Sequence, residues 1–148
     1  MRVFLFLIVA TCLVCAAVAD AMQASDKEAI VKAALDYAEG WYEGDADRMA
    51  TCLHPELAKR VMKMNRETGE GKLESMGKET LVEYTKAGYG KSTPKEKQLK
   101  EVTVLDVFGN AASAKIEMSD WIDYLHLAKS NGKWVIVNVL WEMKPRAE

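Results

Sequence analysis

The stretch from Trp121 to Met143 decides the fold, and it reads WIDYLHLAKSNGKWVIVNVLWEM. Two runs rich in β-branched and aromatic residues flank the dipeptide Asn131-Gly132. Asn-Gly favours a type I′ turn, because both central residues of that turn need a positive φ. The stretch therefore predicts a β-hairpin with a two-residue turn, and counting back from the turn places Asp123 opposite Leu140.

The predicted hairpin has two faces, and neither is polar enough to face water. One face carries Trp121, Asp123, Leu125, Leu127, Trp134, Ile136, Asn138, Leu140 and Glu142. The other carries Ile122, Tyr124, His126, Ala128, Val135, Val137, Val139 and Trp141. If helices cover the first face, the second exposes more apolar surface than a soluble monomer usually does. We therefore expect a homodimer through the sheet, with the same patch used by both subunits.

The first half of the chain carries helix signals. Ser25-Asp26-Lys27-Glu28 has the pattern of a capping box and predicts a helix from Ser25 to Gly44. Asp45 can cap a second helix, which His54-Pro55 ends, because a proline disfavours helical geometry in the residue before it. Ser75 can cap a third helix.

Strand signals surround the third helix. Residues 57–64 read as a short extended segment, and residues 66–72 read as an exposed loop containing two glycines. From residue 99 the apolar period changes to two, and Gly109-Asn110 marks a turn between two strands. Helices followed by a four-stranded antiparallel meander predict an α+β fold.

The composition limits the classes of function. The chain has 148 residues and a formal net charge of −2, which suits one domain with its own core. A negative charge argues against a nucleic-acid partner, because that binding depends on neutralising phosphates. There is no phosphate-binding loop, no dinucleotide fingerprint and no paired metal-ligand spacing in the sequence, and two histidines are too few for a typical zinc site. We therefore expect no cofactor and no metal.

The first 19 residues read as a secretory signal peptide. Arg2 precedes an apolar run of 16 residues that ends in Ala17-Val18-Ala19, with small residues where signal peptidase requires them. The alternative is an uncleaved anchor, but the run is shorter than the ~20 residues that a spanning helix needs. We expect cleavage before Asp20, one domain over 20–148, a periplasmic or secreted location and no stable membrane anchor. Cys52 is then the one cysteine left, and no intramolecular disulfide forms.

Four motifs carry a family resemblance: Gly40-Trp41-Tyr42-Glu43-Gly44-Asp45, Leu53-His54-Pro55-Glu56-Leu57, Asp123-Tyr124-Leu125-His126-Leu127 and Gly132-Lys133-Trp134-Val135-Ile136-Val137-Asn138. They resemble the nuclear transport factor 2-like superfamily, and more closely its SnoaL-like, lumazine-binding branch. The resemblance implies a cone-shaped fold of about three N-terminal helices packed on a curved, mainly antiparallel β-sheet. It also implies a pocket between the helices and the sheet, but not one activity, because this fold hosts many.

The resemblance suggests residues for chemistry. In the ketosteroid isomerases of the superfamily, a tyrosine and a protonated carboxylic acid form the oxyanion hole. Tyr37 has the spacing of that tyrosine to Gly44-Asp45, and Asp123 opens the matching Asp-x-apolar-x-apolar strand. The position of the general base falls at about Val61, which cannot take a proton. The resemblance therefore implies the polarising half of the machinery without its base, and a steroid-type isomerase is not expected.

Five side chains are candidates for ligand binding: Tyr37, Trp41, His54, Asp123 and Asn138. Asp123 is the strongest, because its expected neighbours are leucines and no basic residue pairs with it, so that an ionised carboxylate there would be costly. The others have structural alternatives: Tyr37 and Trp41 as core aromatics, His54 as a loop anchor and Asn138 as a partner for the backbone. No catalytic residue is identified.

These observations favour an exported small-molecule-binding protein whose pocket lies between helices and curved sheet. An enzyme on the same fold, of the dehydratase, isomerase or hydrolase type, is the first alternative, and the sequence leaves open whether the protein is an enzyme. A non-catalytic dimerisation or accessory module is the second alternative, and it would follow if bulky side chains fill the cone. The sequence does not identify the ligand.

Overall fold

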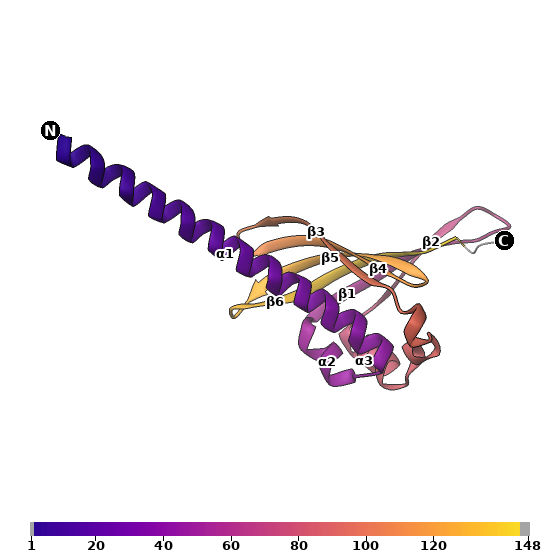
Figure 1. The fold of residues 1–148 in the computed structure, drawn as a ribbon. Coiled ribbons are helices and arrows are strands. Elements are labelled where there is room, and N and C mark those ends of the chain that lie inside the picture. The colour runs from indigo at the N-terminus through magenta and orange to yellow at the C-terminus, as the bar shows by residue number, and fades with distance from the viewer. Residues whose placement is uncertain (1, 146–148) are drawn as a thin grey trace.

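The structure, a computed structural model, describes residues 2–145, with side chains from Met22 onward. Its helices are α1 (Arg2–Glu43), α2 (Ala46–Cys52) and α3 (Lys78–Lys86), and the short 3-10 helices η1 (Tyr89–Ser92) and η2 (Lys95–Lys97) follow α3. Its strands are β1 (Leu53–Met64), β2 (Gly71–Met76), β3 (Lys100–Phe108), β4 (Ala111–Met118), β5 (Trp121–Ser130) and β6 (Lys133–Met143). Figure 1 shows α1 crossing one face of the sheet diagonally, with α2 and α3 near its C-terminal end. This arrangement confirms the predicted α+β class.

The sheet is larger than the predicted meander. Its order is β2-β1-β6-β5-β4-β3, and β1 runs parallel to β6 whereas the other neighbours are antiparallel. The loop predicted over 66–72 is confirmed for residues 66–70 but ends two residues early, because residues 71–76 form β2 and pair with β1. Ser75 therefore lies in a strand, and the helix cap predicted there is wrong. A second strand satisfies a whole row of backbone groups along β1, which one capping side chain cannot do. Helix α3 begins after Gly77 instead, with no side-chain cap.

Helix α1 begins earlier than the sequence predicts. It starts at Arg2 and runs through Ser25, so the predicted helix start there is wrong. No proline or glycine interrupts residues 2–39. A residue that could cap a helix N-terminus does not start a new helix when the preceding residues are already helical. Asp26 instead accepts hydrogen bonds from Lys129 Nζ at 2.6 Å and from Trp134 Nε1 at 2.9 Å, which fasten α1 to the turn end of the hairpin. Within the described part of the chain, no helix combines the length and apolar character needed to cross a membrane.

The predicted turn of the β5–β6 hairpin is confirmed, but the register changes along it. Asn131 and Gly132 have φ values of 50° and 78°, and Ser130 pairs with Lys133 as predicted. The pairing continues to Leu127 with Ile136, and then a β-bulge leaves Val137 as an extra residue in β6. A slip of one residue turns every later side chain of a strand to the opposite face.

The bulge corrects the predicted faces of β6. Asp123 lies opposite Trp141 and not Leu140. Val139 and Trp141 turn toward the helices, whereas Asn138 and Leu140 turn to the outer face, where Leu140 is 50% exposed. The apolar patch predicted on the outer face of the hairpin therefore does not include Val139 and Trp141, and it does include Leu140.

A second bulge changes the face that β3 contributes. Counting from Gly109-Asn110 predicts that Leu105 shares the inner face of β4, but the register shifts between Val104 and Asp106. Val104 then pairs with Ala114, and Leu105 is 53% exposed. The inner face of β3 is therefore carried by Val102, Val104 and Val107, which pack against the core.

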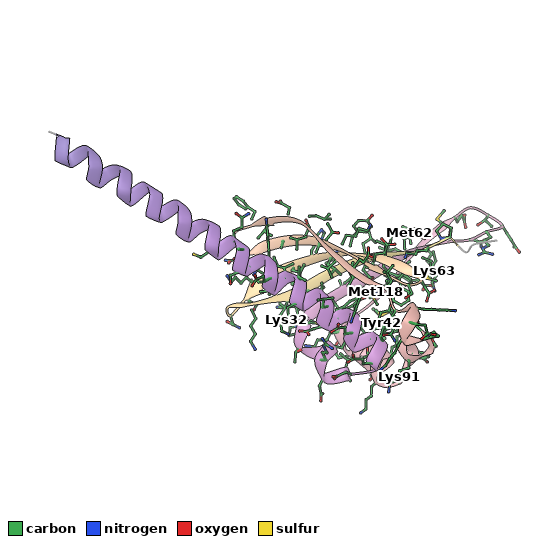
Figure 2. All side chains as sticks on the ribbon, viewed as in Figure 1. Lys32, Tyr42, Met62, Lys63, Lys91 and Met118 are labelled. Atoms are coloured by element: carbon green, nitrogen blue, oxygen red, sulfur yellow. The ribbon has the colours of Figure 1, made fainter. Side chains whose placement is uncertain are left out.

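The core lies between the sheet and the three helices. It contains Ile30, Ala34 and Ala38 of α1, Met49 and Cys52 of α2, Leu81 of α3, and Ile116, Met118, Leu125, Leu127, Ile136 and Val139 of the sheet. The α1 residues are those that the helical period of the sequence predicts. Tyr42 lies between the end of α1 and the sheet (Figure 2), where its hydroxyl donates to the Leu99 carbonyl at 2.8 Å and accepts from Ser119 N at 3.0 Å. Met62, by contrast, lies on the arm formed by β1 and β2, away from the helices (Figure 2).

Candidate functional site

A cavity of about 210 Å³ lies between α1, α3 and the inner face of the sheet. Its lining comprises Tyr37 and Trp41 of α1, Lys59 of β1, Met76 of β2, Leu81 and Tyr84 of α3, and Trp121, Trp141 and Met143 of the last hairpin. Tyr84 and Met143 are 40% and 49% exposed, so part of the cavity wall lies at the surface. Among these lining residues, Lys59 is the one charged side chain.

The aromatic wall is set by helix spacing and by the bulge in β6. Tyr37 and Trp41 are four residues apart on α1 and therefore lie on the same face of the helix. Trp121 packs edge-on against Trp41, with ring centroids 6.0 Å apart, and against Trp141, at 6.2 Å. Trp141 can take part because the extra residue at Val137 turns it inward. The result is an aromatic enclosure.

Lys59 and Asp123 form an ion pair at one end of this enclosure. Lys59 Nζ lies 2.6 Å from Asp123 Oδ1 and donates to the Tyr37 hydroxyl at 2.7 Å. The other carboxylate oxygen of Asp123, Oδ2, accepts from Trp121 Nε1 at 2.8 Å. The side chains of Lys59 and Asp123 are 7% and 0% exposed. The described residues leave no buried side-chain polar atom without a partner.

Burial changes the acid-base properties of two of these groups. Burial lowers the pKa of the Lys59 ammonium, although the nearby charge of Asp123 opposes this effect. Burial, together with the charge of Asp123, raises the pKa of Tyr37 well above its usual value of 10, so Tyr37 remains a neutral phenol at neutral pH. The ammonium also lies near two ring faces, 4.9 Å from the centroid of Trp141 and 5.4 Å from that of Tyr37. Such rings attract a cation held at this range.

The prediction that no basic residue pairs with Asp123 is wrong, because Lys59 does. The sequence contained a signal for Lys59: the run Leu57-Ala58-Lys59-Arg60-Val61 alternates, and it places Lys59 on the same face as two buried apolar residues. A lysine at an inward position of a strand needs a counter-charge. The pairing itself depends on the parallel contact between β1 and β6, which no local pattern predicts.

The five predicted site residues do not all meet. Tyr37 and Trp41 line the cavity, and Asp123 lies directly behind Lys59. His54 lies at the start of β1, where its Nδ1 accepts from Glu56 N at 3.2 Å, in a separate surface hollow beside Asn131. Asn138 lies on the outer face of the sheet because of the bulge.

The contacts of Asn138 belong to that outer face. Its Oδ1 accepts from Arg60 Nη1 at 2.8 Å, and its Nδ2 lies 3.3 Å from His126 Nδ1. Val61, the expected position of the general base, follows Lys59 by two residues on the inner face and carries no titratable group. Among the described residues, the charged groups at the cavity are therefore the ion pair of Lys59 and Asp123.

Helices packed on one side of a curved, mostly antiparallel sheet, with a cavity between them, define the nuclear transport factor 2-like class of folds. Residues 25–142 match the family described as "Putative lumazine-binding", and the chain belongs to this family. No curated protein matches the chain.

Solved structures with the same fold come from several organisms. An NTF2-like protein of unknown function from Shewanella baltica OS155 is 22% identical, with a TM-score of 0.67 and coverage of 83% of this chain and 97% of that one. An NTF2-like protein with a cystatin-like fold from Novosphingobium aromaticivorans is 13% identical (TM-score 0.65, coverage 88% and 89%). A ketosteroid isomerase-like protein from Erwinia carotovora atroseptica SCRI1043 is also 13% identical (TM-score 0.56, coverage 80% and 96%). At these identities the similarity shows the fold alone.

Proposed function

We propose that the protein is an exported small-molecule-binding protein that holds one small, uncharged aromatic compound in the cavity. The observation that carries the proposal is the Lys59–Asp123 pair, buried at the end of an otherwise apolar, aromatic enclosure. Family and fold both favour ligand binding. Mostly apolar walls with a few placed polar groups are typical of small-molecule sites.

The size of the cavity indicates the size of the ligand. An apolar cavity of about 150 Å³ is enough to bind benzene, whereas sites for drug-sized ligands span about 300–1,000 Å³. At about 210 Å³, the cavity suits a single aromatic ring with a short substituent. Trp41, Trp121 and Trp141 narrow the cone but do not fill it, which favours a binding role over an accessory module with an incidental pocket.

The charge of the site indicates the polar group of the ligand. Lys59 and Asp123 together are neutral, so an anionic ligand would add an uncompensated charge to a desolvated site. Among the described residues, Tyr37 and Asp123 accept two of the three N–H groups of the ammonium. The third can donate to a neutral acceptor such as a carbonyl oxygen, and the aromatic walls can stack on the ring of the ligand.

Acetophenone is a suitable probe, and ethylbenzene and benzoate are its matched controls. By calorimetry we expect acetophenone to bind more tightly than ethylbenzene, which lacks the acceptor, and than benzoate, which is charged. Lys59→Met should weaken acetophenone binding by about 10- to 100-fold, the equivalent of losing a hydrogen bond to a charged group of about 1.5–3 kcal/mol. Arg60→Met removes the next cation of the same strand, on the outer face, and should leave the affinity unchanged. Equal affinity for the three compounds would contradict the proposal.

The export part of the proposal rests on the N-terminal sequence, namely Arg2, the apolar run and Ala17-Val18-Ala19. The protein purified from its native host should have the intact mass of a chain that begins at Asp20. A full-length chain recovered from the cytoplasm would contradict export and would leave the binding proposal in place.

A further inference from the structure

The nitrogen of Lys59 offers more than a hydrogen bond to the cavity. We propose that Lys59 captures small aldehydes or ketones as a reversible imine, with Asp123 as the acceptor and donor of the protons. The inference rests on the proposed binding function, and it identifies carbonyl compounds as the ligand class of the same site. Imine formation needs a primary amine, a nearby proton acceptor and a space that admits the carbonyl, and all three meet here.

The geometry selects Lys59 among the nucleophiles whose side chains the structure describes. Its side chain lines the cavity although only 7% of it is exposed, so the amine faces an enclosed space and little bulk water. The thiol of Cys52, also buried, donates to the Met49 carbonyl at 3.1 Å, and Cys52 is not among the residues that line the cavity. Burial raises the pKa of that thiol to about 12, which keeps it unreactive.

Burial of Lys59 favours the neutral form of its amine, which is the nucleophilic form. An ammonium is not a nucleophile, and transfer into apolar surroundings favours its neutral form, which is how lysines that form Schiff bases are activated. The pKa of Lys59 is lowered for this reason. Asp123 Oδ1, 2.6 Å away, is placed to take the proton. The Tyr37 hydroxyl, 2.7 Å from Nζ, stays protonated and can hold the amine in position.

The proposed step balances in atoms and charge. The Lys59 ammonium first gives one proton to the Asp123 carboxylate. The neutral amine forms a C–N bond with the carbonyl carbon, while one N–H proton moves to the carbonyl oxygen and gives a carbinolamine. The carboxylic acid of Asp123 then protonates that hydroxyl, the C–O bond breaks, and water leaves. The products are a protonated imine, the Asp123 carboxylate and one water, and no oxidant or reductant takes part.

Reductive trapping of the full-length protein tests the inference directly. The protein is incubated with one equivalent of benzaldehyde and cyanoborohydride at neutral pH, and the benzylated lysines are mapped by peptide mass spectrometry. We expect at least tenfold more label on Lys59 than on Lys63, which lies four residues further along β1 with its side chain 61% exposed. Lys59→Arg keeps the positive charge beside Asp123, cannot form an imine, and should abolish the selective label. Labelling of Lys63 equal to or greater than that of Lys59 would overturn the inference.

Benzyl alcohol separates this inference from the proposed function, because it has the same ring and no carbonyl. If benzyl alcohol binds the cavity and benzaldehyde leaves Lys59 unlabelled, the imine is refuted and small-molecule binding stands. If neither compound binds, both proposals fall. Selective labelling of Lys59 together with binding of benzyl alcohol supports both.

Discussion

Two Lys–Asp–Trp clusters of almost identical chemistry lie at opposite ends of the last hairpin. In the first, Asp123 accepts from Lys59 at 2.6 Å and from Trp121 at 2.8 Å. In the second, Asp26 accepts from Lys129 at 2.6 Å and from Trp134 at 2.9 Å. Each lysine also lies over an aromatic ring, at 4.9 Å from Trp141 and 5.9 Å from Trp134. The two clusters differ in how far their ion pairs are exposed to water.

In the first cluster, which borders the cavity, the side chains of Lys59 and Asp123 are 7% and 0% exposed. In the second, those of Asp26 and Lys129 are 18% and 28% exposed. We call them the buried and the exposed cluster for this difference between their ion pairs. At the exposed cluster, hydrogen bonds from Lys129 and then Trp134 hold the pKa of Asp26 below its usual range. At the buried cluster, desolvation is the largest influence on the pKa of Lys59, and it lowers that pKa because it disfavours the charged ammonium. The same three side-chain types thus fasten a helix to a hairpin at one end and form a candidate binding site at the other.

Breaking the buried cluster should have the largest effect on stability. Asp123→Ala leaves Lys59 in an apolar site without a counter-charge, and we expect the free energy of unfolding to fall by about 3–5 kcal/mol. Urea unfolding followed by tryptophan fluorescence measures the loss. Asp26→Ala makes the same change at the exposed cluster, where water can solvate Lys129, and should cost clearly less. Equal losses at the two clusters would show that burial does not distinguish them.

A substitution on the outer face of the sheet should have the next largest effect, which is on the assembly of the dimer. We propose a homodimer through the outer face of the hairpin that carries both clusters, where Tyr124 and Leu140 are 48% and 50% exposed. Val137→Glu would place a charge in that interface, and we expect a shift from dimer to monomer by sedimentation, with acetophenone binding retained. The wild-type protein sedimenting as a stable monomer would refute the dimer.

Replacing the whole buried pair should separate stability from binding. In the double variant Lys59→Met/Asp123→Asn no buried charge remains, and the asparagine carbonyl can still accept from Trp121. Exchange of a buried ion pair for neutral groups of similar size is often neutral or stabilising, so we expect unfolding within about 1 kcal/mol of the wild type. Acetophenone binding measured by calorimetry should be lost. Retained binding would mean that the ion pair is only structural.

The exposed cluster should show the smallest effect and a distinct pH dependence. Because the pKa of folded Asp26 lies below the unfolded value of ~3.9, its contacts stabilise the fold above that value. This contribution is lost as the pH falls through the folded pKa. Asp26→Asn should therefore lower the Tm slightly at about pH 7, and the two Tm values should converge at about pH 2. A difference that grows on acidification would contradict the assignment.

The sequence predicts the hairpin well because its turn is chemically specified: Asn131 and Gly132 adopt a positive φ, which asparagine tolerates and glycine reaches freely because it has no Cβ. No residue type signals the bulge at Val137, because the residues around it are mostly β-branched and suit a regular strand equally well. That one residue moved Trp141 into the cavity and Asn138 out of it. For this reason the helix period could predict that Tyr37 and Trp41 share one face of α1, which borders the cavity, whereas the position of Asn138 on the outer face could not be predicted. A ligand-binding role for these residues stays a prediction.

Lys59 marks the other limit of prediction. Its inward position could be read from the alternation of β1, but its partner lies on β5, beyond the parallel neighbour β6. Contacts between residues so far apart in the chain follow from the topology of the sheet and not from any local pattern. The start of α1 was missed for a related reason: Ser25-Asp26-Lys27-Glu28 resembles a capping box, but α1 runs through it and its Asp26 makes a tertiary contact with the hairpin.

The indole N–H signals of the tryptophans test the central claim most directly, because the two clusters provide the site and its control in one spectrum. In a ¹H–¹⁵N correlation experiment, titration with acetophenone should shift the signals of Trp41, Trp121 and Trp141, which line the cavity. The signal of Trp134, which donates to Asp26 at the other end, should not move. If Trp121 and Trp141 stay unperturbed at saturating ligand, or if Trp134 alone shifts, the cavity beside Lys59 is not the binding site.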